Sequence, residues 1–132
     1  MVTPRFKRLV IDGVGLLGGS LGMALKRRAM AQTVVGLGRS VERLERARQL
    51  GALDEIHTHP EPTLSGADAV VLAVPPRQIR DHLRDFAPLF APGAFITDVG
   101  SVKARIVDEA ERALPGGALF IGSHPMAGSE KS

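Results

Sequence analysis

The residues with the clearest chemical meaning are three glycines near the start of the chain, Gly13, Gly15 and Gly18, which follow a short apolar run. At this spacing the first glycine allows a tight turn, and the second lets the backbone approach a pyrophosphate. The third lets the next helix pack close to the preceding strand. Because a helix N-terminus directs free N–H groups at phosphates, the backbone of Leu16 and Leu17 belongs to the same predicted dinucleotide site.

Two later segments carry residues suited to proton transfer. Ser101 lies between Thr97 and Lys103, and His124 lies shortly after Gly122. Each segment follows a predicted strand, so both are expected at the edge of the sheet that holds the glycine loop. A serine facing a histidine there could handle the proton of a hydroxyl substrate. Ser101 could instead serve only as the N-cap of the next helix.

The residues after the second predicted strand bear on the choice of cofactor. A domain selective for NAD usually has an acidic residue near this point to bind the ribose 2′-hydroxyl, but here Gly38 has no side chain. Arg39 follows and could bind a 2′-phosphate through its guanidinium, and Ser40 could add a hydroxyl. The pattern favours NADP over NAD. The alternative is an exposed arginine beside an ordinary N-cap, with NAD as the cofactor.

Strands and helices are predicted to alternate along the chain. Apolar runs predict strands over 8–12, 33–37, 55–58, 69–74, 94–97 and 118–121. Helical periodicity predicts helices over 16–30, 41–50, 78–90 and 102–114. This order is typical of an α/β fold, a Rossmann-type doubly wound parallel sheet with helices on both faces, forming one domain over residues 1–132.

Some positions in these elements receive specific predictions. The first helix is expected to stack Leu17, Leu21 and Leu25 on one face. The second is expected to turn Val41, Leu44, Ala47 and Leu50 inward. The stretch 59–62 contains two prolines and is expected to break regular structure. Ala73, Val74 and Pro75 follow a central strand and are expected to line the nicotinamide-ribose region, or else simply to end the strand.

Composition excludes several classes of protein. The 132 residues include no cysteine, tyrosine or tryptophan, and the net charge is only +3. These values argue against disulfides and against nucleic-acid binding. No apolar run is long enough to cross a membrane. The absence of cysteine suits a cytoplasmic protein.

The motifs together resemble the N-terminal nucleotide-binding domain of the prephenate and arogenate (cyclohexadienyl) dehydrogenases. The matching segments are GVGLLGGSL from Gly13, DVGSVK from Asp98 and GSHPMAGSEKS from Gly122, in the order found in that family. The last segment is the most specific. The resemblance implies oxidative decarboxylation of prephenate or arogenate with hydride transfer to NAD(P)+ in tyrosine biosynthesis.

The resemblance also implies roles for individual residues. His124 would accept the proton of the ring hydroxyl, and Ser101 would hydrogen-bond both that hydroxyl and the histidine. Ser129 and Glu130 would form a polar pair at the mouth of the substrate site, and Gly100 would contact the cofactor. The family continues into a helical dimerisation domain that this chain lacks, so we expect the cofactor-binding part of a homodimer, inactive or weakly active alone. The alternatives are another NADP-dependent reductase and a non-catalytic nucleotide-binding module.

Several charged residues are harder to interpret. Asp12 directly precedes Gly13, where the family has an apolar residue, and its carboxylate would repel a pyrophosphate unless it were protonated or bound by turn N–H groups. His82 is expected to be solvated on a helix. His57 and His59 lie near each other, but without a third ligand they are expected to be surface residues, and no metal site is predicted.

Overall fold

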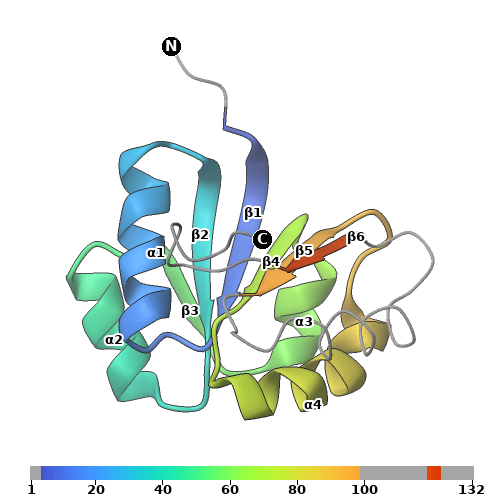
Figure 1. Cartoon of the computed structure of the whole chain (residues 1–132). Coiled ribbons are helices and arrows are strands. Elements are labelled where there is room, and N and C mark those ends of the chain that lie inside the picture. The colour runs from blue at the N-terminus through green and yellow to red at the C-terminus, as the bar shows by residue number, and fades with distance from the viewer. Residues whose placement is uncertain (1–3, 99–118, 123–132) are drawn as a thin grey trace, which may run out of the picture.

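The computed structural model describes residues 4–98 and 119–122, which form a parallel sheet flanked by helices (Figure 1). The strands are β1 (Phe6–Asp12), β2 (Ala31–Leu37), β3 (Glu55–His57), β4 (Ala69–Leu72), β5 (Phe95–Asp98) and β6 (Leu119–Gly122). The helices are α1 (Leu16–Arg27), α2 (Val41–Gln49), α3 (Pro60–Ser65) and α4 (Pro76–Phe86), with a 3-10 turn η1 (Ala87–Leu89) after α4. The helix predicted over 102–114 lies outside the described residues.

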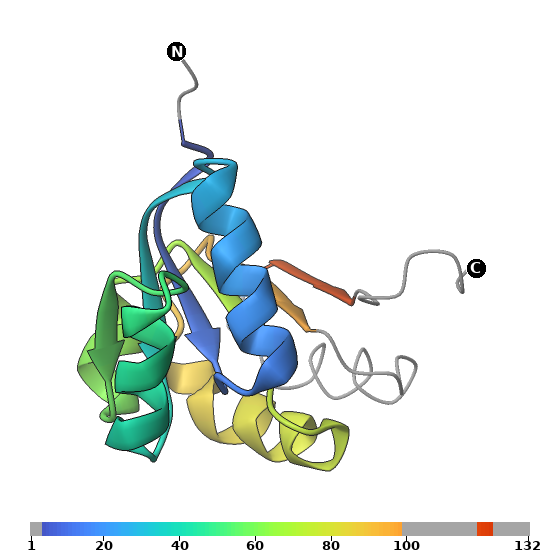
Figure 2. The ribbon, with the colours of Figure 1, turned by 90° about the vertical axis from the view of Figure 1, so that its left-hand side faces the viewer.

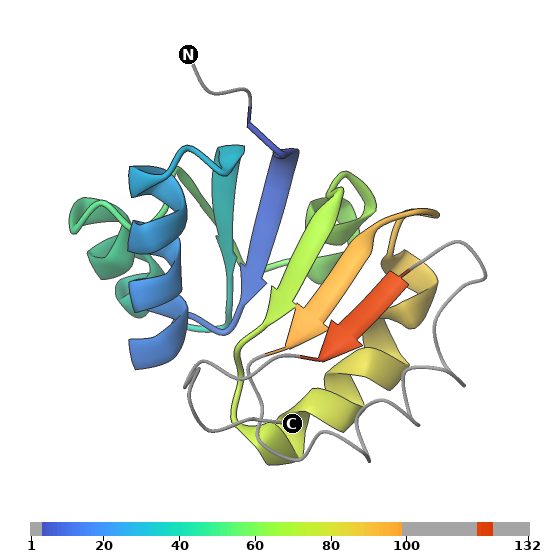
Figure 3. The same cartoon turned by 45° about the horizontal axis from the view of Figure 1, so that its top comes forward.

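The sheet has six strands in the order β3-β2-β1-β4-β5-β6, and every adjacent pair is parallel. The chain therefore starts in the middle, builds outward to β3, and crosses back to β4 on the other side of β1. This reversal between β1 and β4 is the switch point of a doubly wound sheet, so the predicted fold class is confirmed. In Figure 3 the arrowheads of β1, β4, β5 and β6 point to one edge of the sheet.

Helices cover both faces of the sheet. On one face Leu64 of α3 and the α4 residues Ile79 and Leu83 pack with Val10, Val70 and Ile96 from the strands. On the other face α1 runs back along the sheet (Figure 2), and Leu44 and Ala47 of α2 pack with Ile11 and Val34. Because both faces are buried, β4 is continuously apolar, as its sequence predicted.

The predicted inward faces of the first two helices are only partly correct. Leu44 and Ala47 of α2 are buried, but Val41 and Leu50, at its two ends, are exposed. In α1, Leu21 and Leu25 pack against the core, whereas Leu17 is 48% exposed. Leu17 and Val41 lie in the first turn of their helices, and Leu50 is the C-cap residue that follows α2.

The prediction that residues 59–62 break regular structure is wrong. Pro60 begins the short helix α3, where a proline in the first turn is tolerated because its missing N–H has no partner inside the helix. Thr63 supports this turn by donating its hydroxyl hydrogen to the carbonyl of His59, at 2.8 Å. Among the described residues no helix is long and apolar enough to cross a membrane.

Candidate nucleotide-binding site

The carboxyl ends of the strands form one row across the sheet. Asp12 of β1 is in register with Leu37 of β2 and Leu72 of β4, Leu72 is in register with Asp98 of β5, and Asp98 with Gly122 of β6. Three strand spacings separate the ends of β1 and β6, about 14 Å at the usual spacing. β1 and β6 therefore end at the same edge of the sheet, and the loop after β1 leaves from that edge.

Gly13 makes the turn that leaves β1. Its φ of +96° lies in the region that favours glycine, and a Cβ here would lie 2.6 Å from Cγ1 of Val74. The N–H of Gly13 donates to the carbonyl of Leu37 at 2.9 Å, which holds the turn against the end of β2. Both the conformation and the lack of space require glycine at this position.

The other two loop glycines have opposite surroundings. A Cβ on Gly15 would meet nothing within 4 Å, so this backbone faces open space. A Cβ on Gly18 would lie 2.3 Å from the carbonyl oxygen of Gly13, so α1 passes tightly against the turn. The helix N-terminus has no side-chain cap, and its first turn contains no acidic residue. The loop thus presents uncapped N–H groups beside an open approach, as phosphate binding requires.

The segment after β4 lies against the glycine loop. The N–H of Ala73 donates to the carbonyl of Asp12 at 2.8 Å, and Val74 is the residue that excludes a side chain at Gly13. Pro75 is exposed and is the N-cap residue of α4, which begins at Pro76. The structure therefore brings Ala73 and Val74 to the predicted cofactor loop, and Pro75 follows them in the chain. The contact of these three residues with the nicotinamide ribose stays a prediction.

Arg39 and Ser40 lie in the turn after β2, at the same edge. Both are exposed, and Ser40 caps α2 by accepting a hydrogen bond from the N–H of Arg43 at 3.2 Å. Arg39 has no ion pair within the part of the chain that is described. A Cβ on Gly38 would make only an ordinary contact, at 3.5 Å from Leu44, so sterics alone do not explain a glycine here.

The structure gives Asp12 a partner that the sequence did not reveal. Asp12 Oδ2 lies 2.5 Å from Nδ1 of His82, which is on α4, and the Asp12 side chain is only 3% exposed. The expectation that His82 is solvated is wrong, because its side chain is 23% exposed and its ring packs on Phe86 with centroids 4.8 Å apart. The one signal in the sequence was the presence of Asp12 directly before the glycine loop, where a carboxylate needs a partner.

Both groups of this pair hold a proton more tightly than usual. The hydrogen bond to Asp12 raises the pKa of His82 above 6.5, in spite of partial burial and the nearby positive charge of Arg39. Burial raises the pKa of Asp12, an effect that the bond to His82 opposes. The pair therefore keeps one proton up to a higher pH than ordinary histidine and aspartate side chains would, and with one proton its net charge is zero.

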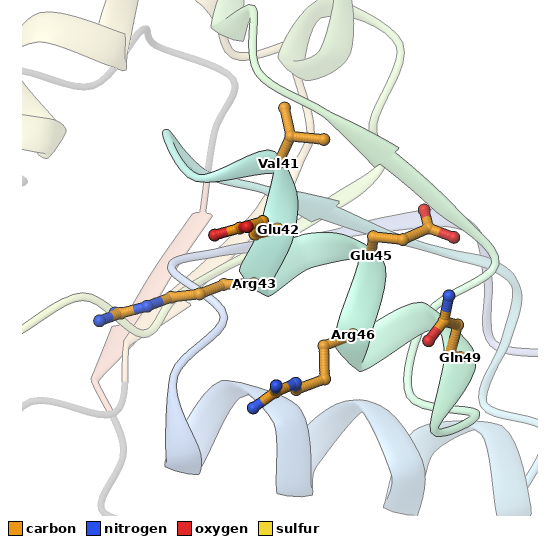
Figure 4. A pocket seen from close by; sticks show the side chains of 6 residues that line it. All are labelled: Val41, Glu42, Arg43, Glu45, Arg46 and Gln49. Atoms are coloured by element: carbon orange, nitrogen blue, oxygen red, sulfur yellow. The ribbon is translucent and has the colours of Figure 1, made fainter.

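A hollow of about 560 Å³ lies along α2, lined by Val41, Glu42, Arg43, Glu45, Arg46 and Gln49 (Figure 4). All its lining residues come from one helix, and none belongs to the glycine loop. We therefore do not identify it as the cofactor site.

His57 and His59 are exposed, as predicted, and His57 lies 3.1 Å from Glu55. Among the described residues no cluster of three potential ligands could hold a metal ion.

Several predicted site residues lie outside the described part of the chain. They are Gly100, Ser101, His124, Ser129 and Glu130. Only the strands that lead to them, β5 and β6, are placed, and both end at the edge that carries the glycine loop. Their predicted roles rest on the sequence.

The strand order, the switch point and the glycine loop define a Rossmann-type nucleotide-binding domain. A family model described as "Prephenate dehydrogenase, nucleotide-binding domain" matches residues 21–132. The chain belongs to this family. The recognition of its N-terminal nucleotide-binding domain from sequence motifs is thereby confirmed.

Individual relatives agree with this assignment. The chain is 36% identical to the prephenate dehydrogenase of Bacillus subtilis over 128 residues, which cover 94% of this chain and 34% of that protein. It is 33% identical to the structure of Aquifex aeolicus prephenate dehydrogenase bound to hydroxyphenyl propionate and NAD+, with a TM-score of 0.81 over 95% of this chain and 43% of that one. Synechocystis arogenate dehydrogenase matches at 32% identity and a TM-score of 0.80, over 94% and 42% of the two chains. The chain thus spans well under half the length of each of these relatives.

Proposed function

We propose that this chain is the cofactor-binding part of an enzyme that oxidatively decarboxylates prephenate or arogenate with NAD(P)+ as the hydride acceptor. The observation that carries the proposal is the glycine loop, which meets the end of β4 at the switch point of a domain belonging to the prephenate dehydrogenase family. The relative that binds NAD+ and a hydroxyphenyl ligand supports this class of cofactor and substrate.

The described residues fit a dinucleotide. Gly13 and Gly18 fill positions at which a Cβ would clash, and Gly15 leaves space for a close approach. The uncapped N-terminus of α1, at Leu16 and Leu17, would bind the pyrophosphate, since its N–H groups and helix dipole favour anions. Ala73, Val74 and Pro75 would border the nicotinamide ribose, and Gly100 would contact the cofactor.

In the proposed reaction the cofactor, when bound, would supply the acceptor for the hydride that leaves the ring carbon bearing the hydroxyl. His124 takes the hydroxyl proton, so that this ring carbon becomes a carbonyl. The ring carboxylate then leaves as carbon dioxide, its C–C bonding pair makes the ring aromatic, and the resulting phenolate oxygen takes a proton back from His124. Ser101 hydrogen-bonds the substrate hydroxyl and His124, and Ser129 and Glu130 flank the substrate. Because aromatisation favours the reaction, the protein's main contribution is to align substrate and cofactor.

We further propose NADP as the preferred cofactor, with NAD also possible. Gly38 offers no carboxylate to repel a 2′-phosphate, and the exposed Arg39 offers a guanidinium to bind it. Ser40 uses its oxygen to cap α2, but its hydroxyl hydrogen is still available to a phosphate oxygen. A homodimer and a cytoplasmic location are further predictions.

Turnover by the full-length protein tests the proposal. Prephenate or arogenate is mixed with NAD+ or NADP+, and the absorbance of the reduced cofactor is followed. His124→Ala should lower turnover about 10²- to 10⁴-fold, the usual effect of losing a general base, with cofactor affinity unchanged. His57→Ala is the matched control, since this exposed histidine is at the far edge of the sheet on β3.

The outcomes separate the candidate functions. Turnover that depends on His124 supports the dehydrogenase. Tight NAD(P)+ binding without turnover of either substrate would favour another reductase or a non-catalytic nucleotide-binding module. Unchanged turnover in His124→Ala would contradict the assignment of the base.

A further inference from the structure

A buried carboxylate lies directly before the loop that is proposed to receive a pyrophosphate. Asp12 is in the row of strand ends, its carbonyl accepts the N–H of Ala73, and its side chain is 3% exposed. The carboxylate of Asp12 is paired with His82, which lies on α4, the helix that follows β4. A charge so placed acts through protein rather than water, so its effect on a nearby anion is little screened.

We propose that His82 is a positioning residue of the cofactor site, the counter-ion of Asp12 that lets the glycine loop accept a dinucleotide pyrophosphate. The inference rests on the proposed function of that loop. With one shared proton the pair is neutral, and the N–H groups of α1 act on the phosphates unopposed. Without that proton the pair carries one negative charge beside the loop and repels the phosphates.

The other charged groups near His82 come from two elements. Arg39, in the turn after β2, disfavours the charged imidazole, and Asp85, one turn along α4 itself, favours it. The bond to Asp12 of β1 outweighs both. Phe86 covers the ring and contributes no charge. The pair therefore couples cofactor affinity to pH, and affinity should fall as the pair loses its proton.

Three variants separate charge from shape. His82→Asn keeps a donor near the position of Nδ1 but cannot carry a charge, Asp12→Asn removes the carboxylate, and the double variant removes both charges. His57→Gln is the matched control, since His57 also pairs with a carboxylate, at 3.1 Å from Glu55, but is exposed on the edge strand β3. NAD+ affinity is measured by calorimetry across pH, with uncharged adenosine as a second ligand.

The unchanged protein should bind NAD+ more weakly as pH rises through the pKa of His82. His82→Asn should move this decline to lower pH and weaken NAD+ about tenfold near pH 7, the scale of one little-screened charge. The double variant should regain affinity and lose the pH dependence. Adenosine affinity should not change, which a merely structural role would not predict.

Two outcomes would overturn the inference alone, and a third would also overturn the proposed function. Equal NAD+ affinity and pH dependence in folded His82→Asn and the unchanged protein would refute the role of His82. An equal loss of adenosine and NAD+ affinity would reduce it to a structural contact. If the unchanged protein bound no dinucleotide, the proposed function itself would fail together with the inference.

A measurement on the unchanged protein covers the case in which a variant does not fold. Since coupling is reciprocal, saturating NAD+ should raise the pKa of His82, followed by NMR of its ring. A pKa of His82 that does not respond to NAD+ would also refute the proposal.

Discussion

The carboxylate of Asp12 and the imidazole of His82 lie 2.5 Å apart, although 70 positions separate the two residues in the sequence. The contact joins the end of β1, where the glycine loop starts, to the middle of α4. It explains how an acid is accommodated at a buried position of the sheet. A carboxylate there without its partner would leave a buried charge uncompensated.

The first prediction concerns the dependence of stability on pH. Because the folded-state pKa of His82 is raised above 6.5, its pairing stabilises the protein fully below that value, and the stabilisation is lost as pH rises through the folded pKa. The raised pKa of Asp12 acts in the same direction. The free energy of unfolding in urea should therefore decrease from mildly acidic to mildly alkaline pH, and Asp12→Asn should reduce that slope. A slope that is the same in Asp12→Asn would contradict the pairing.

The second prediction concerns the packing of α1 on the loop. Gly18→Ala should destabilise the protein by about 1–3 kcal/mol, since its Cβ would lie 2.3 Å from a backbone oxygen of the turn. Gly19→Ala is the control, because nothing lies within 4 Å of that Cβ, and alanine in a helix should stabilise by about 0.5–1 kcal/mol. Urea unfolding compares the two, and opposite signs are expected. Similar effects would show that helix propensity, rather than contact with Gly13, decides the outcome.

The third prediction concerns Arg39. If this side chain binds a 2′-phosphate, Arg39→Asp should weaken NADP far more than NAD, because an attraction becomes a repulsion. Titration of both cofactors against both proteins provides the measurement. Parallel changes for NADP and NAD would remove the proposed preference.

The fourth prediction uses the neighbouring glycine. The position of Gly38 has room for a side chain, so Gly38→Asp should fold normally and introduce the carboxylate that NAD-selective domains carry. The ratio of NADP to NAD affinity should fall. An unchanged ratio would mean that position 38 does not face the ribose.

The fifth prediction concerns the start of β1. Asp68 accepts the N–H groups of Lys7 and Arg8, each at 2.9 Å, through its two carboxylate oxygens. Asp68→Asn leaves one acceptor for two donors and should cost about 1 kcal/mol of stability. Asp81→Asn, which removes an exposed ion pair with Arg84 on α4, should have a much smaller effect on stability, because solvent screens the pair. If the two substitutions had equal effects, the bonds to β1 would contribute nothing specific.

Much of the fold followed from local patterns. The apolar run of β4 was predicted correctly, and the N-cap that was the alternative reading of Ser40 is formed before α2. Each of these features depends on residues adjacent in the chain. The predictions failed at Val41 and Leu50, whose burial depends on how far the sheet extends beneath α2. The helix that begins at Pro60 was missed because proline, which breaks the interior of a helix or strand, is favoured in the first turn of a helix.

The glycine spacing by itself predicted a tight turn and a close-packed helix after β1. The structure shows the physical reason, since only a residue without a side chain tolerates Val74 beside position 13 and the Gly13 carbonyl beside position 18. The motif order likewise identified the family. Only the tertiary structure decided what neutralises Asp12, because the crossover brings α4 back over the end of β1 and no local pattern encodes that contact. Sequence spacing specifies neighbours along one element, whereas partners across elements depend on how the whole sheet is wound.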